Sequence, residues 1–263
     1  IERMRFFQLA NGGFSYWPGG SGGFATGSLE GYAVYATTYA SHFLVEAEKK
    51  GYTIPASMRA GMMRNLRATA QEWTVNKGSA LDQAYRLYVL ARAGQPELGA
   101  MNRLREMREL DAVARWVLAA GYQLAGMADA ARQLATGDPL AVRDYKRTDY
   151  TFGSGLRDHA LVLQSLVQLG QLDKAEPLIR AISDELATEN WYSTQSVAYS
   201  LMAMSQLAGA RAAGSFSFVQ VVGGKETAVT ASSAVYQTTL AGFPDAGAPV
   251  VVRNTSGGPL FAT

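Results

Sequence analysis

The feature that most constrains the fold is a helical periodicity that runs from about residue 29 to residue 209 and is interrupted by glycines. Apolar residues recur at spacings of three and four, as they do along one face of a helix. Glycine can close a helix because it adopts a positive φ without steric cost. We therefore predict helix ends at five glycines, which are Gly51, Gly94, Gly121, Gly170 and Gly209.

The predicted helices come in pairs. Apolar residues stand in the same phase before Gly94-Gln95 and before Gly170-Gln171, which indicates an internal repeat. A second helix follows each, and Asp173 with Glu176 has the spacing of a capping box for one of them. Such pairs recur every ~30 to 45 residues, and each buries one face only by stacking on its neighbour.

The small residues of the inner helices favour a closed ring over an open solenoid, because they permit tight curvature. We predict an α/α toroid of helical hairpins over residues 1–211, with its N-terminal part missing. On its first long helix, Tyr35, Tyr39, Phe43 and Ala47 form one predicted stripe. The small inner residues are Ala36, Ala40, Ala84, Ala198 and Ala203.

After Gly214 the pattern changes to alternation and β-branched residues, which is typical of strands. Strands are expected near residues 216–220, 227–231, 236–240 and 250–253. Residues 215–263 therefore form a β-rich segment, interpreted as a small or truncated β-sandwich that begins a second domain. The chain as a whole is expected to be mainly α.

Composition excludes several classes of function. The 263 residues carry 24 basic and 22 acidic side chains, a net charge of +2, without the basic run that nucleic-acid binding favours. No apolar run approaches the roughly 18 residues that span a bilayer. There is no cysteine and there are two histidines, so we expect no metal and no cofactor. The first residues resemble neither a signal peptide nor a translation start, so we expect a piece of a longer protein.

An aromatic, glycine-rich loop occupies residues 11–20, NGGFSYWPGG. Phe14, Tyr16 and Trp17 supply a large apolar surface, so the loop can plug the end of a helical barrel; direct ligand contact is the alternative. Trp191, in NWYSTQ at residues 190–195, is expected to fill a second corner as Trp17 does.

Few residues suggest catalysis. Arg157, Asp158 and His159 are adjacent on a predicted helix and so do not face one another as a triad, which favours a buried or capping role. Ser154 lies between glycines, but a helix N-cap explains it better than a nucleophile elbow. His42 lies close to Tyr35 and Tyr39 and belongs either to core-edge packing or to a tyrosine–histidine site. The mixed charges and tyrosines of residues 144–150 indicate a surface connection.

Four segments in order resemble the thioester-domain region of bacterial alpha-2-macroglobulins, followed by a β module. They are FQLANGGFSYWPGG, YASHFLVEAEKKGYTIP, YTFGSGLRDHALVLQSLVQLGQLDKAEPLI and NWYSTQSVAYSLMAM. The resemblance implies a toroid up to about Gly209 and the start of the following macroglobulin domain after it. It also implies a function, because such proteins are extracytoplasmic protease traps that enclose or covalently capture a protease after it cuts a bait region.

From this resemblance we expect an endopeptidase-inhibitor module rather than an enzyme, at a periplasmic or cell-surface location. Target proteases and neighbouring macroglobulin domains are the expected partners, and membrane anchoring would arise only through missing regions. The loop residues Phe14, Tyr16 and Trp17 are candidates for shielding a thioester from water.

The chain departs from the family pattern in two ways. Many members form a thioester from a Cys-x-Glu-Gln motif, and this chain has no cysteine, so that motif would belong upstream of Ile1. Members that transfer to hydroxyls have a histidine a little after the segment matching residues 11–14. None occurs between Ser15 and Ser41, which favours amine capture or steric trapping.

Three alternatives remain. A toroid-fold polysaccharide lyase or glycan-binding domain would use Tyr39, His42 and His159. A terpene-cyclase-like enzyme lacks its aspartate-rich motif here, since the aspartates are dispersed. A simple interaction scaffold would be distinguished by the absence of Cys-x-Glu-Gln from the complete gene product.

Overall fold

A computed structural model of the chain describes residues 1–18, 29–146, 151–211, 216–232, 236–239, 249–256 and 260. The chain forms two compact units, Ile1–Ala203 and Met204–Thr263. Gly19 and Gly20 of the aromatic loop, and residues 147–150 of the expected surface connection, lie outside the described residues. The chain is mainly α-helical with a small antiparallel sheet, as the two periodicities predict.

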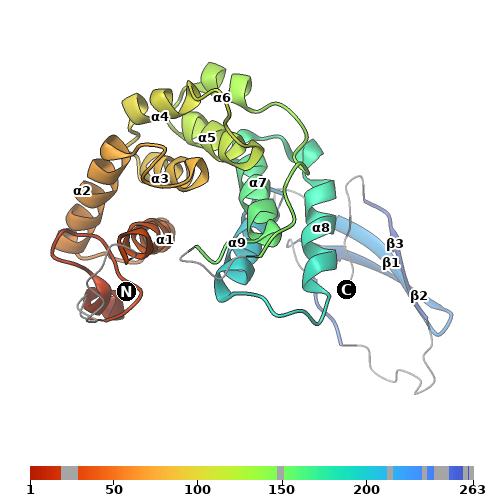
Figure 1. Cartoon of the computed structure of the whole chain (residues 1–263). Coiled ribbons are helices and arrows are strands. Elements are labelled where there is room, and N and C mark those ends of the chain that lie inside the picture. The colour runs from red at the N-terminus through yellow and green to blue at the C-terminus, as the bar shows by residue number, and fades with distance from the viewer. Residues whose placement is uncertain are drawn as a thin grey trace. The chain divides into compact units, whose positions relative to one another are not determined.

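The first unit is built from helical hairpins. The odd-numbered helices α1, α3, α5 and α7 pack on one another in sequence, and the even-numbered helices cover them from outside (Figure 1). The α-helices are α1 (Leu29–Lys49), α2 (Ala56–Glu72), α3 (Ala80–Arg92), α4 (Leu98–Arg105), α5 (Ala112–Leu124), α6 (Ala128–Leu134), α7 (Gly155–Leu169), α8 (Glu176–Leu186) and α9 (Thr194–Arg211). Two 3-10 helices, Glu2–Phe7 and Leu172–Lys174, precede α1 and α8.

The inner row of helices closes through α9. Ser196 of α9 lies with its hydroxyl 2.8 Å from that of Ser154, the N-cap of α7. Tyr199 of the same helix contacts α1, where its hydroxyl lies 3.3 Å from that of Tyr35. The predicted ring of hairpins is therefore confirmed, and its inner helices are buried on nearly every face, as in α3 and α5.

Three of the five predicted helix ends are confirmed and two are wrong. Gly51, Gly94 and Gly170 follow helices with φ of 87°, 75° and 71°. Gly121 and Gly209 lie inside α5 and α9 instead. A Cβ added at Gly121 would lie 3.6 Å from the backbone of α3, which is an ordinary contact distance, so packing against α3 does not by itself require glycine there. The glycine after α5 that takes a positive φ is Gly126, at 77°.

Side-chain caps begin several inner helices. Ser79, Asp111 and Ser154 accept hydrogen bonds from backbone N–H groups of the first turns of α3, α5 and α7, at 3.0, 2.9 and 3.1 Å. The expected Asp173 capping box is wrong. Asp173 lies in the 3-10 turn before α8, which starts from Ala175 without a side-chain cap.

The predicted aromatic stripe of α1 is wrong at Phe43, which is 53% exposed. The buried face of this helix instead includes Thr37, Ser41, His42 and Leu44. Tyr35 of the predicted stripe is buried, whereas Phe43 lies on the exposed side of the helix.

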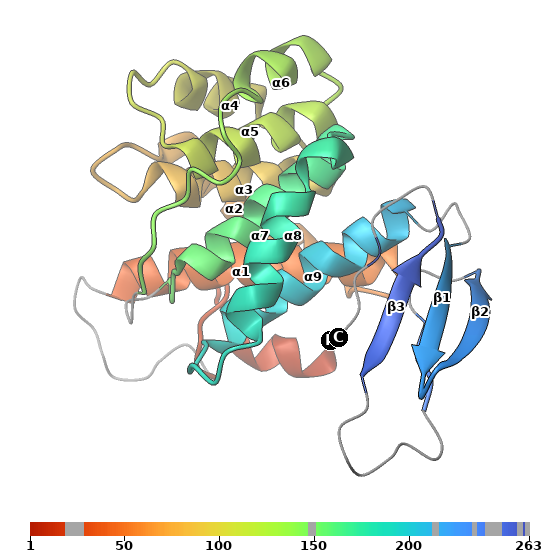
Figure 2. The same ribbon diagram turned by 90° about the vertical axis from the view of Figure 1, so that its right-hand side faces the viewer.

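The second unit contains a three-stranded antiparallel sheet in the order β2-β1-β3 (Figure 2). Its strands are β1 (Phe216–Val222), β2 (Lys225–Ala231) and β3 (Val250–Asn254). Gly223 and Gly224 both take positive φ, 56° and 80°, in the two-residue turn that joins β1 to β2. The strand predicted at residues 236–240 is wrong over 236–239, where Tyr236 packs edge-on against Phe218 instead of joining the ladder, and residue 240 lies outside the described residues.

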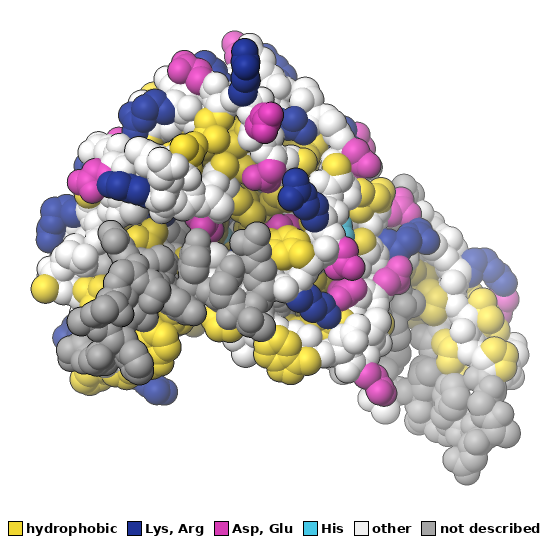
Figure 3. Space-filling model, viewed as in Figure 1, with side chains coloured by type: hydrophobic (Ala, Val, Ile, Leu, Met, Phe, Trp, Pro, Cys, Tyr) yellow, Lys and Arg dark blue, Asp and Glu magenta, His cyan; other side chains and the backbone are white. Residues whose placement is uncertain are grey.

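The visible face in Figure 3 intermixes Lys and Arg with Asp and Glu side chains. Within the described part of the chain, no helix combines the length and apolarity needed to traverse a bilayer. Over the same residues, no three His, Asp or Glu side chains gather as a metal site requires.

Candidate functional site

The aromatic loop contacts the first hairpin through its backbone, by a hydrogen bond to α1 and by packing on α2. Phe14 donates its N–H to Thr37 Oγ1 of α1 at 2.7 Å, and its side chain is 1% exposed. Gly12 takes a φ of 88° and packs on the backbone of α2, where an added Cβ would lie 2.2 Å from the carbonyl oxygen of Gly61. Phe14 is therefore buried against the first hairpin, and the plugging of a barrel end by this loop stays a prediction.

Tyr16 ties the same loop to the last inner helix. Its hydroxyl accepts a hydrogen bond of 2.8 Å from Gln195 Nε2 of α9, and its ring meets Phe152 edge-on at 6.4 Å. Burial raises the pKa of Tyr16, against the lowering effect of the Gln195 hydrogen bond, so the phenol stays neutral. Phe152 itself has a φ of 45°, a strained conformation for a residue with a side chain.

The two tryptophans expected to fill corners do not. Trp17 is 54% exposed and Trp191 is 73% exposed, so the expectation is wrong for both. Trp17 packs edge-on against Tyr16 at 6.0 Å, on the outer side of the loop. The loop thus has a buried anchor in Phe14 and an exposed aromatic in Trp17.

A cluster of buried tyrosines lies where the inner helices converge. Tyr35, Tyr85 and Tyr199 come from α1, α3 and α9, and the ring centroids of Tyr85 and Tyr199 are 5.7 Å apart. Burial raises the pKa of all three phenols, so each remains a neutral hydrogen-bonding group. His42 joins the cluster through Nδ1, which lies 2.9 Å from the Tyr85 hydroxyl.

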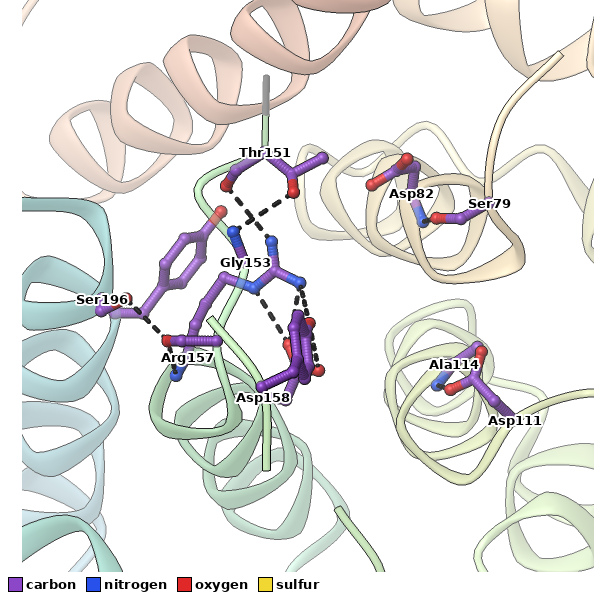
Figure 4. A network of polar contacts seen from close by, with 12 residues as sticks. Ser79, Asp82, Asp111, Ala114, Thr151, Gly153, Arg157, Asp158 and Ser196 are labelled. Carbon is purple, nitrogen blue, oxygen red and sulfur yellow. Dashed lines mark hydrogen bonds and ion pairs between the residues drawn. The ribbon is translucent and has the colours of Figure 1, made fainter. Parts of the chain in front are cut away.

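The other side of the cluster is a buried ion pair on α7. Figure 4 shows the Arg157 guanidinium between the backbone of Thr151 and the carboxylate of Asp158, with Nη2 to Oδ1 at 2.8 Å and Nη1 to the Thr151 oxygen at 3.3 Å. Tyr145 donates to Asp158 Oδ2 at 2.7 Å and accepts from Arg157 at 3.0 Å. Burial raises the pKa of Asp158, while Arg157 opposes that effect. Each buried charge is therefore paired, which supports the predicted buried role.

Ser154 is confirmed as a helix N-cap. Its Oγ accepts from the backbone N–H of Arg157 and lies next to Ser196, with no histidine among its hydrogen-bond partners. His159, one turn further along, is half-buried and lines a cavity of about 220 Å³ together with Asp144, Glu185 and other residues. Burial lowers the pKa of His159.

Among the described contacts, none joins His159 of α7 to Tyr39 or His42 of α1, the residues with which it was predicted to form one site. Tyr39 packs on Tyr199, with centroids 5.5 Å apart, and His42 packs on Tyr85. His42 is 1% exposed, so its ring has no surface to present to a polysaccharide. The assignment of Tyr39, His42 and His159 to one site stays a prediction.

Sequence reasoning missed the tyrosine cluster, although a signal was present. The run Ala-Tyr-x-Leu occurs at residues 84–87 and again at residues 198–201, each time at the same distance from the start of an inner helix. Tyr85 and Tyr199 therefore occupy equivalent places in two repeats. The pattern was visible, but the meeting of the two side chains depends on closure of the ring.

An α/α ring of this kind, followed by a small sheet, also occurs in solved macroglobulins. Native alpha-2-macroglobulin from Escherichia coli superposes with a TM-score of 0.68 at 22% identity, over 88% of this chain and 14% of that chain. Salmonella alpha-2-macroglobulin reacted with methylamine gives 0.65 at 22%, over 88% and 15%. The trypsin-activated Escherichia coli protein gives 0.62 at 21%, over 96% and 16%.

These likenesses show the fold. The chain spans about one seventh of the length of these macroglobulins, as the shares of 14% to 16% state. No protein-family model matches the sequence, and no curated protein matches it.

Proposed function

We propose that this chain is a fragment of a bacterial alpha-2-macroglobulin-like, broad-spectrum protease inhibitor that traps proteases after bait cleavage. The observation that carries the proposal is the agreement of two features. The ordered series of four motifs resembles the thioester-domain region, and the ring of hairpins in which those motifs lie superposes on solved macroglobulins. In this proposal residues 1–211 correspond to the thioester domain and residues 215–263 to the start of the following domain.

The fragment acts as part of an inhibitor rather than as an enzyme. Its partners are target proteases, met through the complete protein, and neighbouring macroglobulin domains. A periplasmic or cell-surface location follows from the same resemblance. Nucleic acid is not among the proposed partners, in keeping with the nearly balanced charge.

The aromatic loop is the proposed shield of the reactive group. Phe14 and Tyr16 hold the loop to α1 and α9, and this leaves Trp17 exposed at its outer side. A side chain of this size can exclude water from a strained acyl group that hydrolysis would destroy. Because this chain has no cysteine, a thioester cysteine would come from elsewhere in the complete gene product.

Protease trapping is tested on the complete gene product. We would incubate it with trypsin and other endopeptidases, and then assay each protease on a small peptide and on a large protein substrate. Trapping predicts one new cut in the inhibitor and loss of cleavage of the large substrate, while the small peptide is still cleaved. If both substrates are still cleaved while the protein is simply digested, the proposal fails.

The shielding role has its own test. Trp17→Ala should accelerate spontaneous loss of the thioester, measured as the decline of methylamine incorporation during storage. Trp191→Ala, another exposed tryptophan, is the matched control and should decay at the unaltered rate. Equal decay of the Trp17 variant and the unaltered protein would refute shielding but would leave trapping standing.

A further inference from the structure

A second cavity, distinct from the one that His159 lines, lies in the first hairpins. It has a volume of about 530 Å³ and is lined by Leu9, by Asn11 and Gly13 of the aromatic loop, and by residues of α1, of α2 and its connection to α3, and of α3. Its lining includes apolar residues, among them Leu9, Val34 and Ala68, and polar ones, among them Asn65, Trp73 and Arg86. It is of the size that small-molecule sites have.

Arg86 is an unusual wall residue because its charge is buried without an acidic partner. The side chain is 2% exposed, and its one hydrogen bond is from Nη1 to the amide oxygen of Gln83. Arg86 Nε is buried and has no acceptor. Burial lowers the pKa of this guanidinium to about 10, while Asp82, one turn earlier, opposes the shift without coming within ion-pair distance.

Two other arginines of this unit, one buried and one partly buried, are paired with carboxylates. Arg157 contacts the Asp158 carboxylate at 2.8 Å, and Arg92 contacts Glu46 at 2.7 Å. A buried guanidinium that lacks a counter-charge is costly, so such groups are normally paired or bind a ligand. Among the residues that the structure describes, Arg86 is the buried arginine that has no carboxylate partner.

A second donor of the same cavity also lacks an acceptor. The indole Nε1–H of Trp73 is buried and makes no hydrogen bond. Arginine and the indole group donate and do not accept, so both positions call for an acceptor atom. Lys77 adds a positive charge to the lining, and Glu72 adds an exposed negative one that forms no ion pair with Arg86. The described lining therefore has a surplus of one positive charge.

We propose that this cavity binds a carboxylate that carries an apolar group. The carboxylate pairs with the Arg86 guanidinium, the Trp73 indole contributes to the same lining, and the apolar group lies against Leu9, Val34 and Ala68. A carboxylate supplies the missing negative charge and accepts charge-assisted hydrogen bonds from a guanidinium. The inference does not depend on the protease-trap proposal, since it rests on the cavity alone.

The test uses the complete gene product and phenylacetate as the probe. Isothermal titration should show phenylacetate binding, whereas the uncharged phenylacetamide, of nearly the same shape, should not bind. Arg86→Gln should weaken phenylacetate binding at least about tenfold, the effect expected for one lost charge-assisted hydrogen bond. Arg92→Gln removes a partly buried arginine outside the cavity and should leave phenylacetate binding unchanged.

Trp73→Phe provides a variant that keeps the charge and removes only the indole donor. It should weaken binding less than Arg86→Gln while the midpoint of thermal unfolding stays close to that of the unaltered protein. This second variant keeps the inference testable if Arg86→Gln fails to fold.

Two sources of the carboxylate are separated by a second probe, the capped dipeptide acetyl-Phe-Glu-amide. Binding of phenylacetate in preference to the peptide supports a small acid as the ligand, and the reverse supports an acidic side chain of a polypeptide. The inference is overturned if neither probe binds, or if phenylacetamide binds as well as phenylacetate.

Discussion

His42 is expected to make the stability of the fold fall in mild acid. Its ring is 1% exposed, and Nε2 has no hydrogen-bond partner, although Glu46 Oε1 of the same helix lies 3.8 Å away. Burial lowers the pKa of His42 from 6.5 to about 4; the Glu46 carboxylate opposes the shift and Arg92 of α3 adds to it. The tyrosines that face the ring, Tyr85 and Tyr88, are neutral at these pH values.

The magnitude follows from the two pKa values. The unfolded chain takes up a proton near pH 6.5 and the folded chain only near pH 4, so the unfolded state binds more protons between them. The stability is therefore fully present above pH 6.5 and is lost as the pH falls toward 4. Each pH unit in this window is worth about 1.4 kcal/mol, which gives a loss of about 2.5 kcal/mol from His42 between pH 7.5 and pH 4.5.

Urea unfolding of the purified chain at pH 7.5, 6.0 and 4.5, followed by far-ultraviolet circular dichroism, measures this loss. Carboxylates also titrate in this range, so the comparison is with His42→Asn, which keeps a polar atom near the position of Nδ1 and cannot take up a proton. The variant should lose about 2.5 kcal/mol less than the unaltered chain over the same interval. His159→Asn, at a half-buried position, is the control and should change the pH dependence less. Equal pH dependence in His42→Asn and the unaltered chain would refute the reasoning.

Three further predictions concern the free energy of unfolding at neutral pH. Gly12→Ala should cost about 3 kcal/mol, because the new Cβ would lie 2.2 Å from a backbone oxygen and the residue has a positive φ. Gly51→Ala has a similar φ and nothing within 4 Å of the new Cβ, so it should cost only about 1 kcal/mol. Equal shifts of the two urea midpoints would contradict this prediction. Leu44→Ala, at a fully buried position of α1, should cost about 2 to 5 kcal/mol, and Phe43→Ser, its exposed neighbour, at most about 0.5 kcal/mol, as thermal unfolding would show. Asp111→Ala should cost about 1 kcal/mol by removing the cap of α5, and no change in the urea midpoint would argue against that cap.

The helices were predictable because their signals are local. The positive-φ glycines Gly51, Gly94 and Gly170 each follow a segment of helical periodicity, and a glycine there ends a helix without steric cost. Gly121 carries the same local signal but lies within α5. The local pattern therefore does not distinguish a glycine that ends a helix from one in the interior of a helix.

The candidate sites were less predictable, for a related reason. Phe14 is buried, but Trp17, three residues away in the same loop, is exposed. Both are large aromatics, and hydrophobicity alone cannot say which one the loop turns inward. Hydrogen bonds from the loop to Thr37 and Gln195, residues far along the chain, decide it.

The sequence by itself determined the order of helices, the change to strands after residue 214 and the pairing of inner with outer helices, because periodicity and glycine placement act over a few residues. Only the tertiary structure decided which side chains meet inside the ring. Tyr35 and Tyr199 are 164 residues apart and make contact because the ring closes. Arg86 of α3 is buried, and its Nε has no acceptor among the described residues. Burial and long-range contact depend on how all the helices pack together, and no local pattern encodes them.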